Sequence, residues 1–142
     1  MIYMASTSIS PDKTAAEIMA LLGKKGAVRI VTEYSQGEIT AISFAIDLQG
    51  KLVPFRLPIK WEKCLAAMKR DRETPHRFCN EHQAKRVAWR QVLRWLQAQF
   101  ALIDTGMAEF AEVMLPYVQV SLEHTFYEQI AAEHFMMLPE KT

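Results

Sequence analysis

The spacing of apolar residues predicts a helix near the start of the chain. Ser10 precedes Pro11, and this order is typical of an N-cap followed by the first helical position, where a missing N–H is harmless. Apolar residues then recur at helical spacing through residues 15–22. Gly23 and Gly26 follow, so we expect the helix to end there.

Three segments with the character of strands come next. Residues 28–34 are rich in β-branched side chains, and in residues 38–47 Thr40, Ile42, Phe44 and Ile46 alternate with a second apolar set. A third strand is predicted over residues 51–57. Short turns containing glycine separate the three segments, so the pattern predicts an antiparallel meander. Pro54 cannot donate a hydrogen bond to a neighbouring strand, which places the third strand at an edge.

The rest of the chain shows helical periodicity. Helices are predicted at residues 61–70, 80–104, 107–115 and 122–136, and Asn80 has the character of an N-cap for the longest of them. The sequence therefore predicts an α+β fold: an N-terminal helix, a three-stranded antiparallel meander and a helical C-terminal half.

Composition agrees with a single domain over residues 1–142. Half of the residues are hydrophobic and 23% are charged, which is typical of a compact globular protein. The chain has no run of 18 apolar residues and does not begin like a signal peptide. We therefore expect a cytoplasmic protein with no membrane association, which needs no cofactor to fold.

Charge is distributed unevenly along the chain. Residues 60–94 carry ten Lys or Arg against four Asp or Glu, whereas residues 95–142 carry one against seven. Such an asymmetry is expected either for a surface that binds an anionic partner or for two halves that attract each other.

One face of the longest predicted helix combines basic and polar residues. Arg86, Arg90 and Arg94 share this face, and the opposite face carries Val92, Trp95 and Leu96, which we expect to be buried together with Phe44. Arginine suits phosphate because its planar guanidinium offers several donors, and aromatic rings can stack with bases. The candidate nucleic-acid-binding residues are Arg77, Lys85, Arg86, Trp89, Arg90 and Arg94.

The same basic face has a second interpretation. The acidic residues of the last segment could pack beside the long helix and pair with its arginines, within one chain or between subunits; these residues are Glu109, Glu112, Glu123, Glu128 and Glu133. The apolar run at residues 135–138 is a candidate contact for a homo-oligomer.

Arrangements typical of enzymes and metal sites are incomplete. His76, Cys79 and His82 have ligand-like spacing but no fourth ligand, and we take Cys64 and Cys79 as free thiols. No nucleophile elbow or glycine-rich phosphate loop is present. We therefore expect neither catalysis nor a bound metal.

Four stretches resemble small uncharacterised proteins encoded by tailed bacteriophages and prophages. They are Val53–Pro58, Gln83–Arg90, Trp95–Gln99 and Met114–Tyr117. The resemblance implies an accessory protein acting in the cytoplasm of a host cell. The hypothesis from the sequence is binding of nucleic acid, preferentially single-stranded DNA, through the basic helix face. The alternative is a protein-interaction module that inhibits or adapts a host or phage factor.

Overall fold

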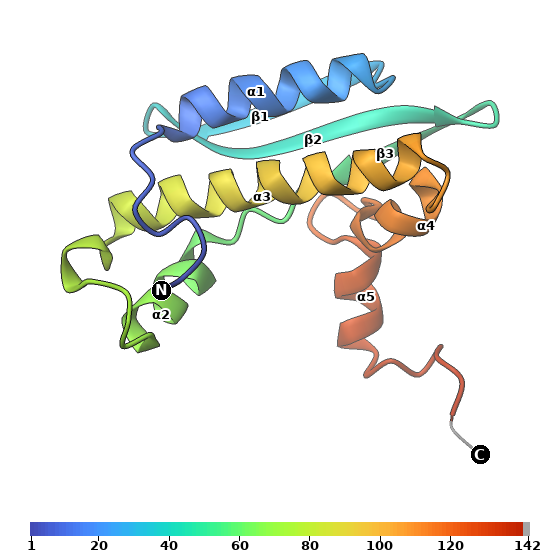
Figure 1. Ribbon diagram of the computed structural model, residues 1–142. Helices are drawn as coiled ribbons and strands as arrows, with labels where there is room; N and C mark the ends of the chain where they lie inside the picture. The colour runs from blue at the N-terminus through green and yellow to red at the C-terminus, as the bar shows by residue number, and fades with distance from the viewer. Residues whose placement is uncertain (141–142) are drawn as a thin grey trace.

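The computed structural model describes residues 1–140 and has the predicted α+β architecture (Figure 1). An N-terminal helix precedes three strands, and helical segments form the rest. Their bounds are α1 Pro11–Lys24, β1 Arg29–Ser35, β2 Glu38–Leu48, β3 Lys51–Arg56, α2 Trp61–Arg70, η1 His76–Phe78, α3 Glu81–Asp104, α4 Phe110–Met114, η2 Leu115–Tyr117 and α5 Phe126–Ala132.

The three strands form an antiparallel sheet in the order β1-β2-β3. Both hairpins have two-residue loops, Gln36-Gly37 and Gln49-Gly50, and all four residues have positive φ angles. Two consecutive residues with positive φ angles form a type I′ turn, whose twist matches that of the paired strands. Glycine adopts a positive φ easily, which explains why it is the second residue of each loop. β3 lies at an edge, as Pro54 predicted.

A β-bulge modifies the expected alternation along β2. The register between β1 and β2 shifts between Glu33 and Tyr34, opposite Thr40. Ile39 is therefore buried together with Ile42, while Thr40 is exposed. The prediction that Thr40 shares a face with Ile42, Phe44 and Ile46 is wrong, because the bulge reverses the side-chain phase at this point.

The main core lies between one face of the sheet and the two helices that cover it, α1 and α3 (Figure 1). Phe44 from β2 stacks on Phe55 from β3 with ring centroids 5.3 Å apart. Leu22 of α1 and Leu96 of α3 are fully buried in the same cluster. A smaller cluster joins α2, α3 and the N-terminal segment through Met68, Val87 and Ala5.

Capping side chains fix the starts of both long helices. Ser10 Oγ accepts a hydrogen bond from the Lys13 amide at 3.2 Å, and Asn80 Oδ1 accepts one from the Gln83 amide at 2.9 Å. Both residues have the capping role that the sequence predicted. Each satisfies an amide that has no partner within its helix.

The last predicted helix is shorter than expected. α5 begins at Phe126, because Thr125 and Glu128 form a reciprocal capping box, and it ends at Ala132. His134 and Phe135 then adopt positive φ angles, so the helix does not continue to residue 136 as predicted. The predicted helix at 107–115 is likewise reduced to α4, followed by the η2 turn that contains Pro116.

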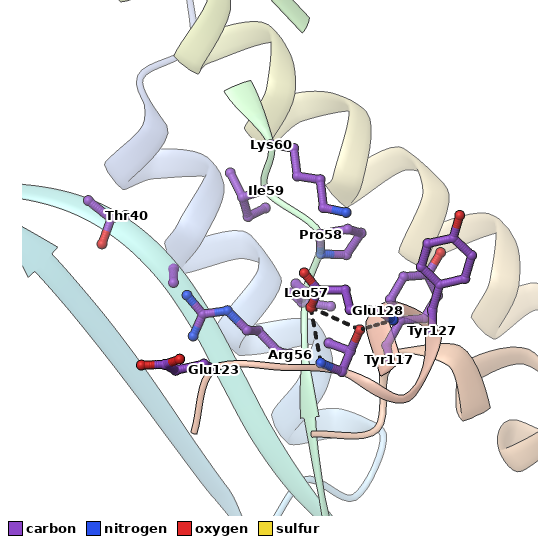
Figure 2. Close-up of a pocket in the computed structure, with 12 residues that line it drawn as sticks. Thr40, Arg56, Leu57, Pro58, Ile59, Lys60, Tyr117, Glu123, Tyr127 and Glu128 are labelled. Atoms are coloured by element: carbon purple, nitrogen blue, oxygen red, sulfur yellow. Dashed lines mark hydrogen bonds between the residues drawn. The ribbon is translucent and has the colours of Figure 1, made fainter. Parts of the chain in front are cut away.

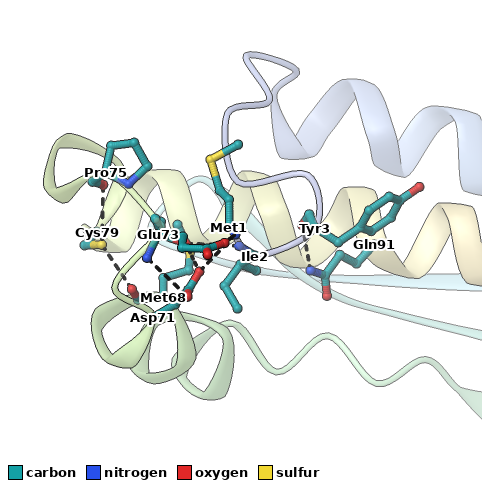
Figure 3. Close-up of polar contacts among 10 residues, drawn as sticks. Met1, Ile2, Tyr3, Met68, Asp71, Glu73, Pro75, Cys79 and Gln91 are labelled. Atoms are coloured by element: carbon teal, nitrogen blue, oxygen red, sulfur yellow. Dashed lines mark hydrogen bonds and ion pairs between the residues drawn. The ribbon is translucent and has the colours of Figure 1, made fainter.

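The N-terminal segment runs across α3 and reaches the loop after α2 (Figure 3). The buried Gln83 side chain donates to the carbonyl oxygens of Ala5 and Thr7, both at 2.8 Å. Farther along α3, Gln91 donates to the Tyr3 carbonyl at 2.8 Å. These contacts hold residues 1–9 over part of the helix face that the sequence suggested as a binding surface.

Candidate nucleic-acid interface

Arg90 does not lie on an accessible surface. Its side chain is only 7% exposed, and its Nη1 donates to a carboxylate oxygen of Glu17 on α1 and to Thr14 Oγ1. Arg90 therefore does not offer the exposed guanidinium that a candidate binding residue needs, because α1 packs along α3 and covers this part of the helix. The guanidinium neutralises an acidic side chain of the protein itself.

Trp89 is also buried, with 2% of its surface exposed. A ring in this position cannot stack with a nucleic-acid base. Trp89 is instead part of the main hydrophobic core. Trp95, expected in the core, is only half-buried and packs edge-on against Tyr117 with ring centroids 5.1 Å apart. The expected burial of Val92, Leu96 and Phe44 is confirmed.

Lys85 is held by two carboxylates and an aromatic ring. Its Nζ lies 2.8 Å from Glu38 and 3.1 Å from Glu81, and 5.0 Å from the centre of the Trp61 ring. The hydrogen bonds to Glu38 and then Glu81 raise the pKa of the Lys85 ammonium. The same contact with Lys85 lowers the pKa of Glu38. Lys85 would have to leave these acids before it could bind a phosphate.

The acids that pair with α3 are therefore not those of the C-terminal segment. Glu17, Glu38 and Glu81 fill this role, and Lys25 of the α1 C-terminus pairs with Asp104 at 2.6 Å. Within residues 1–140, no ion pair joins the basic residues of α3 to the glutamates at 109–133. Basic residues of α3 thus form ion pairs, as the second interpretation of the sequence expected, but the acids that pair with them belong to α1, β2 and α3 itself.

Two of the candidate cations are exposed. Arg94 hydrogen-bonds Gln97 on its own helix at 2.9 Å, and the guanidinium carbon of Arg77 lies 4.6 Å from the centre of the Phe78 ring. Arg86 is half-buried and donates to Gln83 at 3.2 Å, while its Nε is buried without a hydrogen-bond partner among the described residues. The structure thus separates the predicted arginines into exposed, partly covered and buried positions.

A second group of cations lies outside α3. These side chains are exposed, and none has a carboxylate within 4.0 Å in the part of the chain that the structure describes. They belong to α2, the following loop and η1. We call the group the α2–η1 basic surface; it consists of Lys63, Lys69, Arg70, Arg72 and Arg77.

The packing of α2 explains why these cations face solvent. Met68 is buried against α3, and Cys64 and Leu65 are half-buried beside it. The other side of the helix is left to charged residues. The charge count over residues 60–94 covers this region as well as α3, whereas the helical pattern pointed to α3 alone.

Two acidic residues in the loop after α2, Asp71 and Glu73, interact with the amino group of Met1. The amino group of Met1 lies 3.0 Å from Glu73 and 3.5 Å from Asp71, as Figure 3 shows. Asp71 also accepts a hydrogen bond from Thr74 Oγ1 at 2.6 Å, and this bond lowers the pKa of the Asp71 carboxyl. The N-terminal amine therefore offsets acidic charge next to the basic residues.

A separate cavity of about 270 Å³ opens where β3 meets the C-terminal segment (Figure 2). Arg56, Lys60, Tyr117 and Glu128 are among its lining residues. Arg56 is paired with Glu33 at 2.6 Å, and Glu128 is engaged in the capping box of α5. Two of the charges that line the cavity thus already have partners within the chain, whereas Lys60 is exposed.

The three residues with ligand-like spacing do not form a metal site. The Cys79 thiol donates to the Met68 carbonyl at 3.3 Å, and His76 and His82 are exposed. No group of three or more His, Cys, Asp or Glu among residues 1–140 is placed to hold a metal ion. Burial raises the pKa of the other thiol, Cys64.

No helix in residues 1–140 combines the length and apolar character needed to cross a membrane. In comparisons with known proteins, the chain matches no family model, no curated protein and no solved structure.

Proposed function

We propose that the protein binds nucleic acid through the α2–η1 basic surface. One observation carries the proposal: five exposed Lys and Arg side chains occupy adjoining elements without a carboxylate in salt-bridge range among the described residues. Cations of this kind neutralise phosphates and release the counterions that surround a nucleic acid. Arg77 is the residue shared with the sequence prediction.

The chemistry favours contacts to the phosphate backbone over contacts to bases. Arginine donates to phosphate oxygens in a fixed fork, and such contacts position a protein without reading sequence. The aromatic rings nearest to the surface are already in use: Arg77 covers Phe78, and Lys85 lies over Trp61. The preference for single strands relied on stacking by Trp89, which is buried. The proposal is therefore binding through phosphates, with single-stranded and duplex oligonucleotides compared directly.

Fluorescence anisotropy with labelled oligonucleotides over a series of salt concentrations tests this proposal. The test variant combines Arg70→Gln, Arg72→Gln and Arg77→Gln. We expect weaker binding and a log–log salt slope reduced by about one for each phosphate that the variant no longer neutralises.

The matched control removes three exposed cations from other elements, Lys13→Gln, Lys24→Gln and Lys51→Gln. It lowers the net charge by the same amount, and we expect it to bind almost as well as the unmodified protein. An equal loss of oligonucleotide affinity in both triple variants would show that binding depends on the overall charge of the protein and would contradict a role for the α2–η1 basic surface. Absence of binding at low salt, where electrostatic attraction is strongest, would overturn the proposal.

A second candidate function is a protein-interaction module, and the C-terminal segment favours it. Leu122 is 93% exposed and Met136 is 83% exposed, and Met137 and Leu138 beside it are also exposed. Consecutive exposed apolar side chains, as at residues 136–138, commonly mark a site of protein contact. Replacing Met136 and Leu138 by Ser should abolish a complex reconstituted from purified components while oligonucleotide binding is retained.

We place either function in the cytoplasm of a bacterial host, in the phage accessory context that the sequence resemblance implies. Fractionation of tagged protein expressed in bacteria checks this location. Recovery in the membrane or periplasmic fraction would contradict it.

A further inference from the structure

The two edges of the sheet differ in their cover. At the β3 edge, Val118 forms a bridge with Phe55, and the Gln119 amide donates to the Pro54 carbonyl at 2.9 Å. At the β1 edge, the backbone of Arg29–Ser35 has hydrogen-bond partners only in β2, among the residues that the structure describes. An uncovered strand edge offers a row of amides and carbonyls to another strand.

The face of the sheet away from α1 and α3 carries a regular pattern along β1. Arg29, Val31 and Glu33 are all exposed, whereas Ile30 and Thr32 between them are half-buried. Glu33 reaches across this open face to Arg56 of β3 at 2.6 Å, which confirms where its side chain points. The open face is partly apolar, with Val31 49% exposed and Leu52 45% exposed.

This pattern is complementary to itself when the strand is reversed. We propose that two copies of the chain pair through β1, antiparallel, about a twofold axis at Val31. Each Arg29 then lies opposite Glu33 of the second copy, and the two Val31 side chains face each other. Directly opposite residues of unlike charge stabilise an antiparallel pair, and like charges destabilise it.

The charge pattern selects this register over its neighbours. An axis at Thr32 would place Val31 opposite Glu33, and an axis at Ile30 would place Arg29 opposite Val31. Both arrangements would lose the two ion pairs. The bulge between Glu33 and Tyr34 limits the regular pairing to Arg29–Glu33. The product is a six-stranded sheet with one continuous open face.

Sedimentation velocity over a range of protein concentrations tests the pairing, with no nucleic acid present. We expect the unmodified protein to form a dimer that weakens at high salt. Arg29→Glu and Glu33→Arg should each weaken dimerisation by about tenfold or more, because each places like charges opposite one another twice. Glu33 also pairs with Arg56 of its own chain, so the variant R29E/E33R/R56E, which exchanges the charges at all three positions, should recover most of the affinity. A monomeric unmodified protein, or equal dimerisation by all four proteins, would overturn the proposal.

A covalent test is independent of those charges. On a twofold axis, directly opposite Cα atoms lie about 4.5–5.5 Å apart, within the range that a disulfide spans. Val31→Cys should therefore give a disulfide between the introduced thiols of two chains under mild oxidation, identified by peptide mass mapping. Leu52→Cys is the control, because Leu52 is similarly exposed but lies on β3. Equal cross-linking of the two variants, or none in V31C, would contradict an axis at Val31.

Discussion

Arg90 and Glu17 form an ion pair across the contact between α3 and α1, and the two partners differ in exposure. The Arg90 side chain is 7% exposed and Glu17 is 39% exposed. Arg90 Nε is buried without a hydrogen-bond partner among the described residues. The charge of a guanidinium in this position is compensated by Glu17, because removing an arginine from water is costly unless its charge is paired.

Replacing Glu17 should therefore cost more stability than replacing Arg90. We expect Glu17→Ala to lower the free energy of unfolding by about 1–3 kcal/mol, since it leaves a buried charge uncompensated. Arg90→Met removes the charge and keeps an apolar side chain, so its effect should be smaller. Urea denaturation measures both, with the exposed Glu123→Ala as control. A more damaging Arg90→Met would show that the guanidinium contributes more than its cost of burial.

The N-terminal segment depends on Gln83. Its amide donates to the carbonyls of Ala5 and Thr7 in a buried position, and we expect Gln83→Ala to cost about 1–3 kcal/mol because those acceptors lose their partner. Hydrogen exchange should show reduced protection in residues 1–9. Gln91→Ala is the control, because its bond to the Tyr3 carbonyl is exposed and should contribute less. Equal effects of the two changes would contradict a special role for Gln83.

Local patterns were sufficient to predict most of the fold. The caps at Ser10 and Asn80 and the edge position of Pro54 follow from the hydrogen-bonding capacity of single residues, and each is present. These features depend on neighbours within a few positions along the chain. They are therefore visible in the sequence.

The exposure of the candidate site could not be predicted in the same way. Arg90 shares a helix face with polar residues, but Glu17 lies 73 positions away and covers it only after α1 packs on α3. Trp89 and Trp95 both lie on α3, and tertiary packing decides which of them is buried. Trp89 is enclosed in the main core, whereas Trp95 packs against Tyr117. The bulge at Thr40 likewise comes from strand pairing and has no local signal.

The difference between the two tryptophans predicts unequal losses of stability. Trp89→Ala should cost about 3–5 kcal/mol, because a buried ring is lost and a cavity remains. Trp95→Ala should cost less, since that side chain is half-buried beside Tyr117. Urea unfolding followed by circular dichroism measures both. A larger loss for Trp95 would contradict the burial of Trp89 in the main core.

Glu128 should contribute to the acid sensitivity of the C-terminal segment. Its carboxylate accepts hydrogen bonds from the Thr125 amide and hydroxyl, each at 3.0 Å. The bond from the backbone amide is the main cause that lowers the pKa of Glu128 below its ordinary value of 4.5. A carboxyl group whose pKa is lower in the folded than in the unfolded state stabilises the fold at pH values above its unfolded-state pKa. This stabilisation is lost as the pH falls through the pKa of the folded state. The capping box of α5 should therefore weaken below about pH 4.5.

Glu128→Gln and Thr125→Val separate the causes of this effect. Glutamine keeps an acceptor for the Thr125 amide but does not titrate, so hydrogen exchange in α5 should depend less on acid in Glu128→Gln. Thr125→Val removes the hydroxyl bond and keeps the backbone amide, so an NMR titration should show the pKa of Glu128 rising only part of the way to 4.5. A complete return to 4.5 would mean that the hydroxyl, and not the amide, holds the carboxylate in its charged form.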